Sequence, residues 1–507
     1  MINRRELLKL TAGAPLLRMI PPASTYDDNN GTQSKQNILI VVFDALSALN
    51  MSAYQYHRMT MPLLERFLSK STVYHNHYSS APFTTPGTAS LLTGTYSHTH
   101  RAIHLWGQAK ASFSEKNIFK LFTDHYRLAY THNPLADRLL DQFMGIDWHI
   151  PRQKLYLNND PITGWLFSRD YNRAASSRRQ ILSASDGNAY SLFFPNLQTH
   201  YVDWLNKKYH DQFPRGLTIS EANYVIILDD AISWLSNSAG DFKTPFLGYF
   251  HFWPPHSPYR TRFDFIDAFL DDGFVPDKKP NHPLSQGESK FMSDLKRRHY
   301  DEFLLYVDSE FGRLCDHLEK QGLLENTWLI FTSDHGEMFE RGFFGHTAPS
   351  LHQPVLRIPL IISAPGQSSR QDIYSITSSV DVMPTLLHIS GHPIPEWVEG
   401  QLLPPFSSND STAHRSIYAM MAKDNPTETG PLSTVSATVI NNGHKLTQYI
   451  GYEALQGKQL IELYDLNNDY DELHDLSASN PELVNKLLDD IHKTILAGNP
   501  SASRSVN

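Results

Sequence analysis

The amino-acid sequence predicts an α/β fold built around a parallel sheet. Three continuous runs of apolar and β-branched residues, at 37–45, 245–253 and 327–332, have the composition of strands that are covered on both faces. Apolar residues recur at helical spacing between the last two runs, at Phe303, Val307, Phe311, Leu314 and Leu318. Strands that alternate with helices in this way are typical of an α/β domain.

Composition indicates a soluble globular protein with a large core. The chain has 507 residues, of which 40% are hydrophobic and 19% are charged, enough for one large domain and a smaller one. The formal net charge is -9 and no cluster of lysine and arginine stands out, so no nucleic-acid partner is expected. The single cysteine, Cys315, belongs to the long helical pattern, which excludes a disulfide framework and a thiolate metal site.

The first residues resemble a twin-arginine export signal. Arg4 and Arg5 precede a short apolar run at 10–17, which predicts a periplasmic or otherwise exported protein. Arg18 cuts this run short, and the alternative is a cytoplasmic protein with a basic N-terminus. A polar linker follows at 25–36. No stretch of about 18 uncharged apolar residues occurs, so no membrane-spanning helix is expected and a transporter is excluded.

The first predicted strand ends on an acid, Asp44. Functional groups gather at the carboxyl ends of strands in open α/β sheets, which makes Asp44 a candidate site residue. The alternative is that Asp44 caps the following turn. An amphipathic helix at 62–68 and a short strand at 72–77 are expected next.

The segment that follows, 81–96, is predicted to carry a nucleophile. It reads APFTTPGTASLLTGTY, where Thr84, Thr85 and Pro86 mark a turn and 89–92 begin a buried helix. The first N–H groups of a helix attract oxyanions such as sulfate and phosphate, and Gly87 lets the backbone pass close to a ligand. The alternative is an N-capped helix without chemistry.

Further candidates follow later strands. After a helix at 118–122 and a strand at 126–132, Asn133 is either a contact to ester oxygens or a turn residue before proline. The segment 150–215 is rich in aromatic residues, Asn, Asp and Ser, and we interpret it as an insertion near the site. A helix is expected at 220–235.

Two more strands lead into histidines. His256 follows the strand at 245–253 and lies between prolines, which hold it rigidly. Asp334 and His335 follow the strand at 327–332, and His346 lies in a glycine-bounded loop soon after. For each isolated histidine the alternative is a structural role in the core.

The rest of the chain predicts one more strand, a helix and a smaller unit. The strand is expected at 357–362 and the helix at 380–387. A proline- and serine-rich connection near 405 suggests a boundary. Strand-like runs at 411–448 and a helix at 481–491 then form a C-terminal subdomain.

Four of these positions predict a metal site. Asp44, Thr84, Asp334 and His335 would supply two carboxylates, a hydroxyl oxygen and an imidazole to one divalent cation, Mn, Mg or Ca. Coordination lowers the pKa of a hydroxyl, so a threonine could then attack an ester. His256 and His346 would flank the ester, one of them protonating the leaving group.

In this order, the motifs resemble the sulfatase family of the alkaline phosphatase superfamily. The residues that carry the resemblance are the run that ends at Asp44, Thr84-Thr85-Pro86 with Leu91-Leu92-Thr93-Gly94, Pro255-His256-Ser257-Pro258-Tyr259, Thr332-Ser333-Asp334-His335-Gly336-Glu337, Gly345-His346, Asp381-Val382-Met383-Pro384-Thr385-Leu386 and Glu462-Leu463-Tyr464-Asp465. The resemblance implies a doubly wound mixed sheet with a small α+β C-terminal subdomain, one divalent metal ion and ester hydrolysis through a covalent intermediate.

The motifs also suggest the domain organisation. We expect a signal-like segment and linker at 1–36, a sulfatase-like catalytic domain at 37–405, a C-terminal subdomain at 406–495 and a tail at 496–507. The 150–215 insertion lies within the catalytic domain.

The departures from the family pattern favour phosphate esters over sulfate esters. Typical sulfatases have C-x-P-x-R or S-x-P-x-R, whose first residue becomes formylglycine, whereas here Thr84 and Thr88 take the first and last places. Formylglycine cannot form on threonine, so Thr84 would act directly. Ala45 replaces the second acid of an Asp-Asp pair, His335 stands where many sulfatases have Asn, and His346 replaces a lysine. Asn133 and Thr88 are the predicted substrate contacts.

Several functions stay open at this point. The first is a metal-dependent hydrolase that prefers phosphodiesters or phosphomonoesters of small molecules, glycans or lipid headgroups. The alternatives are a sulfuric ester hydrolase, a transferase of the phosphoglycerol or phosphoethanolamine type, and a catalytically silent binder of anionic glycans or lipids. The sequence does not indicate an oligomeric state.

Overall fold

The computed structural model describes residues 35–157, 193–219, 225–347, 349–407, 415–423 and 430–497. The expected export signal and nearly all of the linker therefore lie outside the described residues, as do 158–192 of the expected insertion. The described residues from Gln36 onward belong to one compact unit.

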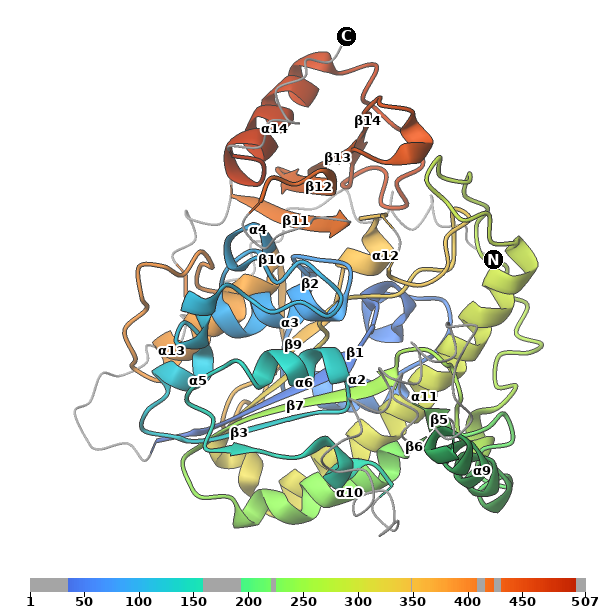
Figure 1. Ribbon diagram of the computed structural model, residues 1–507. Helices are drawn as coiled ribbons and strands as arrows, with labels where there is room; N and C mark the ends of the chain where they lie inside the picture. Colours follow the sequence, from blue (N-terminus) through green and yellow to red (C-terminus); the bar gives the residue numbers. More distant parts are fainter. Residues whose placement is uncertain are drawn as a thin grey trace, which may run out of the picture. The chain divides into compact units, whose positions relative to one another are not determined.

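An eight-stranded mixed sheet forms the centre of this unit (Figure 1). Its strands, in spatial order, are β10 (Gln371–Ser378), β2 (Thr72–Tyr78), β9 (Leu360–Ser363), β8 (Thr327–Thr332), β1 (Asn37–Asp44), β7 (Phe246–Pro255), β3 (Tyr126–Thr131) and β4 (Trp148–His149). Among these eight strands, β9 alone runs antiparallel to its neighbours. The carboxyl ends of the other seven therefore meet at one edge of the sheet.

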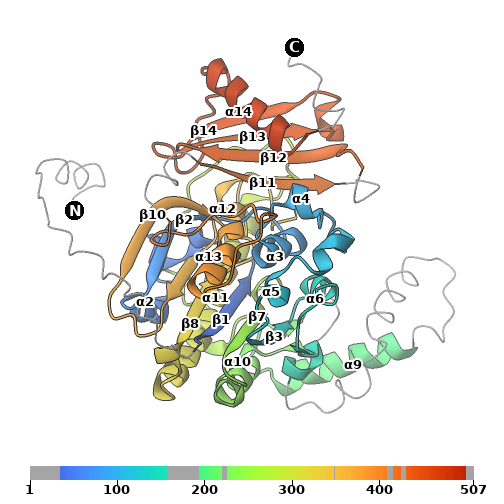
Figure 2. The same ribbon diagram turned by 90° about the vertical axis from the view of Figure 1, so that its left-hand side faces the viewer.

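Helices cover both faces of the sheet, as the predicted α/β class requires (Figures 1 and 2). One face packs against α2 (Pro62–Leu68), α9 (Phe193–Lys208), α10 (Leu228–Ser238) and the long α11 (Lys290–Lys320). The other face packs against α3 (Thr84–Thr93), α5 (Ile118–Leu121), α6 (Pro134–Leu140) and α13 (Val382–Ile389). A small hairpin, β5 (Thr218–Ile219) with β6 (Val225–Ile226), and the short helices α4 (Ser97–His100) and α12 (Gln353–Leu356) complete this part.

Strand β1 shows why the sequence folds into three layers. Its eight residues are all buried, and alternate side chains enter opposite cores. Leu39, Val41 and Phe43 join the core beneath α10 and α11, while the residues between them join the core beneath α3 and α13. A strand with two buried faces must be apolar throughout, which explains its continuous hydrophobic run.

The second sheet is an antiparallel meander in the order β11-β12-β13-β14. Its strands are β11 (Ser416–Lys423), β12 (Thr434–Asn441), β13 (His444–Ile450) and β14 (Leu460–Asp465), and α14 (Pro481–Thr494) packs across it (Figure 2). The predicted small α+β subdomain is therefore present. Leu496, which the sequence placed in a tail, is buried in the core beneath α14.

Two element predictions are corrected. The helix expected at 220–235 begins at Leu228, because residues 225–226 form β6 instead. The strand expected at 357–362 begins at Leu360, since Arg357 ends the short α12 and forms an isolated bridge with Tyr78. Both errors come from extending a periodic pattern past a turn.

Among the residues described, no helix combines the length and the apolar character that crossing a membrane requires.

Candidate active site

Side chains from five neighbouring segments converge at the carboxyl edge of the large sheet. They are Asp44 at the end of β1, Thr84 after β2, Asn133 after β3, His251 in β7, and Asp334 with His335 after β8. All six are buried. The sheet order places β1 between β7 and β8, so segments far apart in sequence meet here.

Thr84 is the first residue of α3, so the turn predicted at Thr84, Thr85 and Pro86 is wrong and the helix begins earlier than the predicted start at 89. All ten residues of α3 are buried. The backbone of Gly87 passes so close to Asp334 that a Cβ at this position would lie 2.4 Å from the Asp334 carbonyl oxygen. The Ser79 hydroxyl donates to the same carbonyl oxygen at 2.6 Å. Gly87 is therefore explained by the approach of α3 to the end of β8, not by a bound ligand.

Asn133 links the hydroxyl of Thr84 to the carboxylate of Asp44. Its Nδ2 donates to Asp44 Oδ2 at 2.6 Å and to Thr84 Oγ1 at 3.1 Å. Its Oδ1 accepts from the Leu135 N–H at 2.8 Å and so caps α6. The two alternatives for Asn133 are thus not exclusive, because one end of the amide forms the cap and the other reaches the site.

The two carboxylates leave buried oxygens without hydrogen bonds. Asp44 Oδ1 lies 3.4 Å and Asp334 Oδ2 lies 3.5 Å from His335 Nε2. Neither oxygen has a hydrogen-bond partner among the residues that the structure describes, although both side chains are fully buried. Ligand atoms of Asp44, Asp334 and His335 lie within 4.8 Å of one another. Buried carboxylate oxygens without partners are costly in an empty core, so this donor set fits a divalent cation.

His251 is a member of this cluster that the sequence did not predict. Its Nε2 lies 3.5 Å from Asp44 Oδ2 and 3.7 Å from Asp334 Oδ2, and makes no hydrogen bond within the described part of the chain. Its Nδ1 lies 3.2 Å from the Tyr249 hydroxyl. The available signal was a single histidine in an otherwise apolar strand, close to the carboxyl end of that strand.

The charges at the site strongly perturb its titration. Burial raises the pKa of Asp44, but the neighbouring His256, His251 and His335 outweigh it and hold that pKa well below its usual value. Burial lowers the pKa of His335, while Asp334 and Asp44 together raise it to about 9. The site therefore keeps an anionic carboxylate in a fully buried position.

His346 packs against His335, and His256 packs against His346. The ring centroids of His335 and His346 are 4.3 Å apart, and those of His346 and His256 are 4.8 Å apart. His256 Nδ1 donates to the Ser257 carbonyl oxygen at 2.8 Å, since a carbonyl can only accept. The Nε2 atom of His256 is thereby left as the nitrogen that can exchange a proton with a substrate.

A buried carboxylate, Glu337, orients His346. Glu337 Oε1 lies 3.0 Å from His346 Nδ1, and its Oε2 accepts from the Tyr259 hydroxyl at 3.0 Å. Burial lowers the pKa of His346, and the nearby His335 and His256 lower it further against the opposing effect of Glu337. Glu337 lies within the motif at 332–337, but no role was predicted for it. The sequence does not show the path of the loop that brings it to His346.

Thr88, the other predicted substrate contact, lies one turn along α3 from Thr84 and is buried. Its hydroxyl faces Tyr249, whose pKa burial and the charge of Asp334 raise well above its usual value. Thr88 therefore lies beside the cluster, behind Thr84 along the helix.

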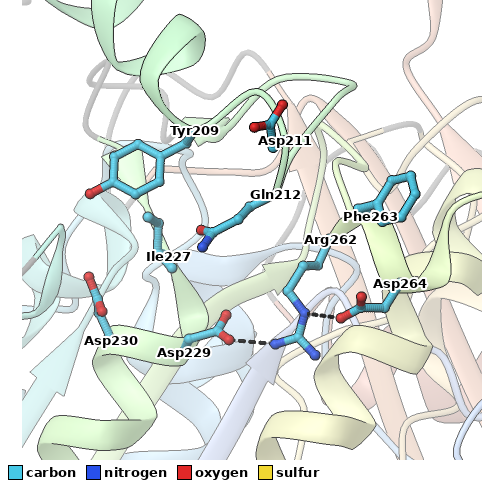
Figure 3. A pocket seen from close by; sticks show the side chains of 9 residues that line it. All are labelled: Tyr209, Asp211, Gln212, Ile227, Asp229, Asp230, Arg262, Phe263 and Asp264. Atoms are coloured by element: carbon cyan, nitrogen blue, oxygen red, sulfur yellow. Dashed lines mark hydrogen bonds and ion pairs between the residues drawn. The ribbon is translucent and has the colours of Figure 1, made fainter.

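A pocket elsewhere in the structure does not belong to this cluster (Figure 3). It is lined by Tyr209, Asp211, Gln212, Ile227, Asp229, Asp230, Arg262, Phe263 and Asp264. Arg262 pairs with Asp229 at 2.5 Å and with Asp264 at 2.8 Å, as the dashed lines in Figure 3 show. None of the sequence-predicted site residues lines this pocket.

Two family models match most of the chain. The sequence model described as Sulfatase matches residues 36–392, and the model described as N-sulphoglucosamine sulphohydrolase, C-terminal, matches residues 340–497. The first match contains every residue of the cluster, and the second contains the small sheet.

Curated relatives carry sulfatase names. Choline-sulfatase of Rhizobium meliloti (strain 1021) is 24% identical over 405 residues, which cover 74% of this chain and 72% of the relative. Arylsulfatase K of Bos taurus is 28% identical over 309 residues, which cover 55% of this chain and 56% of the relative. The chain thus matches little more than half the length of that second relative.

Solved structures share the fold at low sequence identity. Phosphonate monoester hydrolase of Agrobacterium radiobacter has a TM-score of 0.64 and 16% identity, with 90% of this chain and 95% of that chain covered. BT4656 in complex with its substrate D-glucosamine-2-N,6-O-disulfate has a TM-score of 0.63 and 16% identity, with 93% and 100% covered. The family match covers most of the chain, and the chain belongs to the sulfatase family of ester hydrolases within the alkaline phosphatase superfamily.

Proposed function

We propose that the protein hydrolyses phosphate esters, phosphodiesters or phosphomonoesters, with Thr84 as a nucleophile that forms a covalent intermediate. The observation that carries this proposal is the position of the Thr84 hydroxyl, which is buried at the start of α3 between the Asn133 amide and His335 Nε2. A threonine with a merely structural role would not need two carboxylates with unpartnered oxygens beside it.

Asp44, Asp334 and His335, with Thr84 Oγ1, would hold one divalent cation, Mn, Mg or Ca. When bound, such an ion stabilises a threonine alkoxide and neutralises charge on the ester oxygens. Oxygen-rich ligand sets favour these hard cations over zinc in a structural site.

The chain's own groups orient the attack. Asn133 fixes the Thr84 oxygen by donating to it, and the β-branched side chain of threonine restricts its rotamers. The N–H groups at the start of α3 face the ester oxygens with the positive end of the helix dipole. The Thr84 hydroxyl gives up its proton to solvent, the new bond joins Thr84 Oγ1 to phosphorus, and the bond from phosphorus to the leaving oxygen breaks.

The histidines move the protons. His346 has a lowered pKa and its Nδ1 is held by Glu337, which suits a neutral imidazole that accepts a proton from the attacking water. We assign to His256 the role of the general acid, which donates a proton to the leaving oxygen. Water then attacks phosphorus and gives a proton to His346, the bond from phosphorus to Thr84 Oγ1 breaks, Oγ1 takes up a proton from solvent, and the phosphate is released.

Hydrolysis of sulfate esters is the second candidate, because the curated relatives include a choline-sulfatase and arylsulfatases. A threonine ester must be attacked by water directly, whereas a formylglycine hydrate can eliminate its sulfate. The direct route is known in general for covalent phosphoryl enzymes, and we therefore place phosphate esters first.

The release of p-nitrophenol from p-nitrophenyl phosphate, bis(p-nitrophenyl) phosphate and p-nitrophenyl sulfate tests this proposal. We expect metal-stripped protein to be inactive, and activity on a phosphate ester to return with Mn, Mg or Ca. Preferred turnover of the sulfate ester would support the second candidate. Absence of turnover on all three would overturn hydrolysis and favour a transferase or a silent binder.

A further inference from the structure

A second group of potential metal ligands lies far from the catalytic cluster. Asp124 and His125 directly precede β3, and His392 follows α13. Ligand atoms of these three residues lie within 4.8 Å of one another. The catalytic cluster lies at the carboxyl end of β3, and a strand of six residues spans about 20 Å, so the two groups occupy opposite edges of the sheet.

The hydrogen bonds of His125 show which of its nitrogens is available. Its Nε2 lies 3.1 Å from the main-chain carbonyl oxygen of Gln36. A carbonyl oxygen can only accept, so Nε2 carries the hydrogen. In a neutral imidazole, Nδ1 then has a lone pair, and this atom faces Asp124 Oδ1 at 2.7 Å. Two electron-rich atoms at this distance need either a second proton on the ring or a metal ion that both atoms share.

His392 directs a second nitrogen toward the same carboxylate oxygen. Its Nε2 lies 3.0 Å from Asp124 Oδ1. It nevertheless forms no hydrogen bond, because the oxygen is not in line with the ring nitrogen. A nitrogen that points beside an oxygen, and not at it, suits a cation that both atoms share.

The surroundings restrict both rings. The ring of Phe122 meets the rings of His125 and His392 edge-on, with centroid distances of 5.1 and 4.8 Å. The side chain of His125 is 2% exposed, whereas those of Asp124 and His392 are 25% and 16% exposed. Solvent can therefore reach the carboxylate and supply a further ligand.

We propose that Asp124, His125 and His392 form a second metal site, which binds a divalent transition-metal ion such as Zn²⁺. Two imidazoles and one carboxylate are a donor set that zinc uses, and the Gln36 carbonyl plays the usual part of an acceptor that fixes the tautomer of a ligand histidine. The ion would join the start of β3 to the segment after α13. This inference does not depend on the catalytic proposal.

Zinc stoichiometry tests the proposal. Native mass spectrometry of the metal-stripped full-length protein with added Zn²⁺ should show a zinc ion that persists in Asp44→Asn, whose catalytic cluster lacks a ligand. We expect His392→Gln in the Asp44→Asn background to lose this ion, with zinc affinity at least ~10-fold weaker. His388→Gln, which changes an exposed histidine near the end of α13, should keep it.

Two readouts keep the test decisive. Added Zn²⁺ should raise the melting temperature of Asp44→Asn but not that of the Asp44→Asn/His392→Gln double variant, and His392→Gln alone should retain the activity of the unmodified protein. If the variants that carry His392→Gln do not fold, zinc binding by the Asp44→Asn single variant still tests the proposal. Failure of Asp44→Asn to bind any Zn²⁺ at pH 7.5 would overturn the proposal and leave a protonated histidine paired with Asp124.

Discussion

The Nδ1 atom of His346 lies 3.0 Å from Oε1 of the buried Glu337, whose other oxygen accepts a hydrogen bond from Tyr259. This carboxylate holds the ring of His346 against His335 and fixes the nitrogen that faces the site. The arrangement follows the general pattern in which a catalytic base is itself oriented by a third group.

Glu337→Gln should therefore lower kcat by about 10- to 100-fold with little change in KM, because the amide keeps the shape of the side chain and removes its charge. Steady-state kinetics on the best p-nitrophenyl ester measure this effect. Tyr259→Phe, which removes the bond on the opposite oxygen, should cost much less. Equal losses in the two variants would show that Glu337 has a structural role alone.

Asn133→Asp should abolish most activity without removing the cap of α6. Aspartate caps a helix as well as asparagine does. Its second carboxylate oxygen, however, would replace the Nδ2 donor that now lies 2.6 Å from Asp44 Oδ2, and the two negative oxygens would repel each other. We expect kcat/KM to fall by at least ~100-fold. The matched control is Asn117→Asp, the same change at the cap of α5, which should leave kcat/KM unchanged. An active Asn133→Asp enzyme would contradict the assigned contact with Thr84.

Gly87→Ala should destabilise the protein although alanine favours helices. The added Cβ would lie 2.4 Å from the Asp334 carbonyl oxygen, which is backbone and cannot move aside cheaply. We expect a loss of about 1–3 kcal/mol in the free energy of unfolding, measured in urea. Gly240→Ala, where the nearest atom is the end of the flexible Gln321 side chain, should change stability much less. A stabilised Gly87→Ala variant would show that α3 can move away from β8.

The stability of the protein should decline at alkaline pH through His149. Burial lowers the pKa of His149, but Asp137 and Asp141, at 3.0 and 3.1 Å, raise it to about 9. Because the pKa of His149 is raised in the folded state, its ion pairs contribute fully to stability below the unfolded-state pKa near 6.5. This contribution is lost as the pH rises through about 9.

Urea unfolding at a series of pH values measures this effect. His149→Gln should remove about 1–2 kcal/mol of stability at pH 6 and almost none at pH 10, after allowance for solvent screening. The exposed His200→Gln should leave the profile unchanged. A difference between His149→Gln and the unmodified protein that stayed constant with pH would contradict the ion pairs.

The sequence was sufficient to predict the fold class, and the reason lies in the buried strands. Both faces of β1 and β8 are covered, so the residues between their polar ends must be apolar, and their limits follow from composition alone. Asp44 and Asp334 were selected because they end such strands, and the structure brings them together with Thr84 and His335.

The remaining parts of the site depend on tertiary structure. The side chain of His251 reaches the carboxylates because β7 lies beside β1, and strand order cannot be derived from an apolar run. Glu337 meets His346 through a loop without periodicity. Asn133 looked like a turn residue, and its contact with Thr84 depends on the position of α3 against the end of β3.

Capture of the covalent intermediate tests whether Thr84 is the nucleophile. Protein mixed with a phosphate ester and quenched in acid should yield a peptide whose Thr84 carries the phosphoryl group, detected by mass spectrometry. Thr84→Ala should give no adduct and lose activity, whereas Thr84→Ser should keep both in part. Turnover by Thr84→Ala at the rate of the unmodified protein, or an adduct on another residue, would contradict the account.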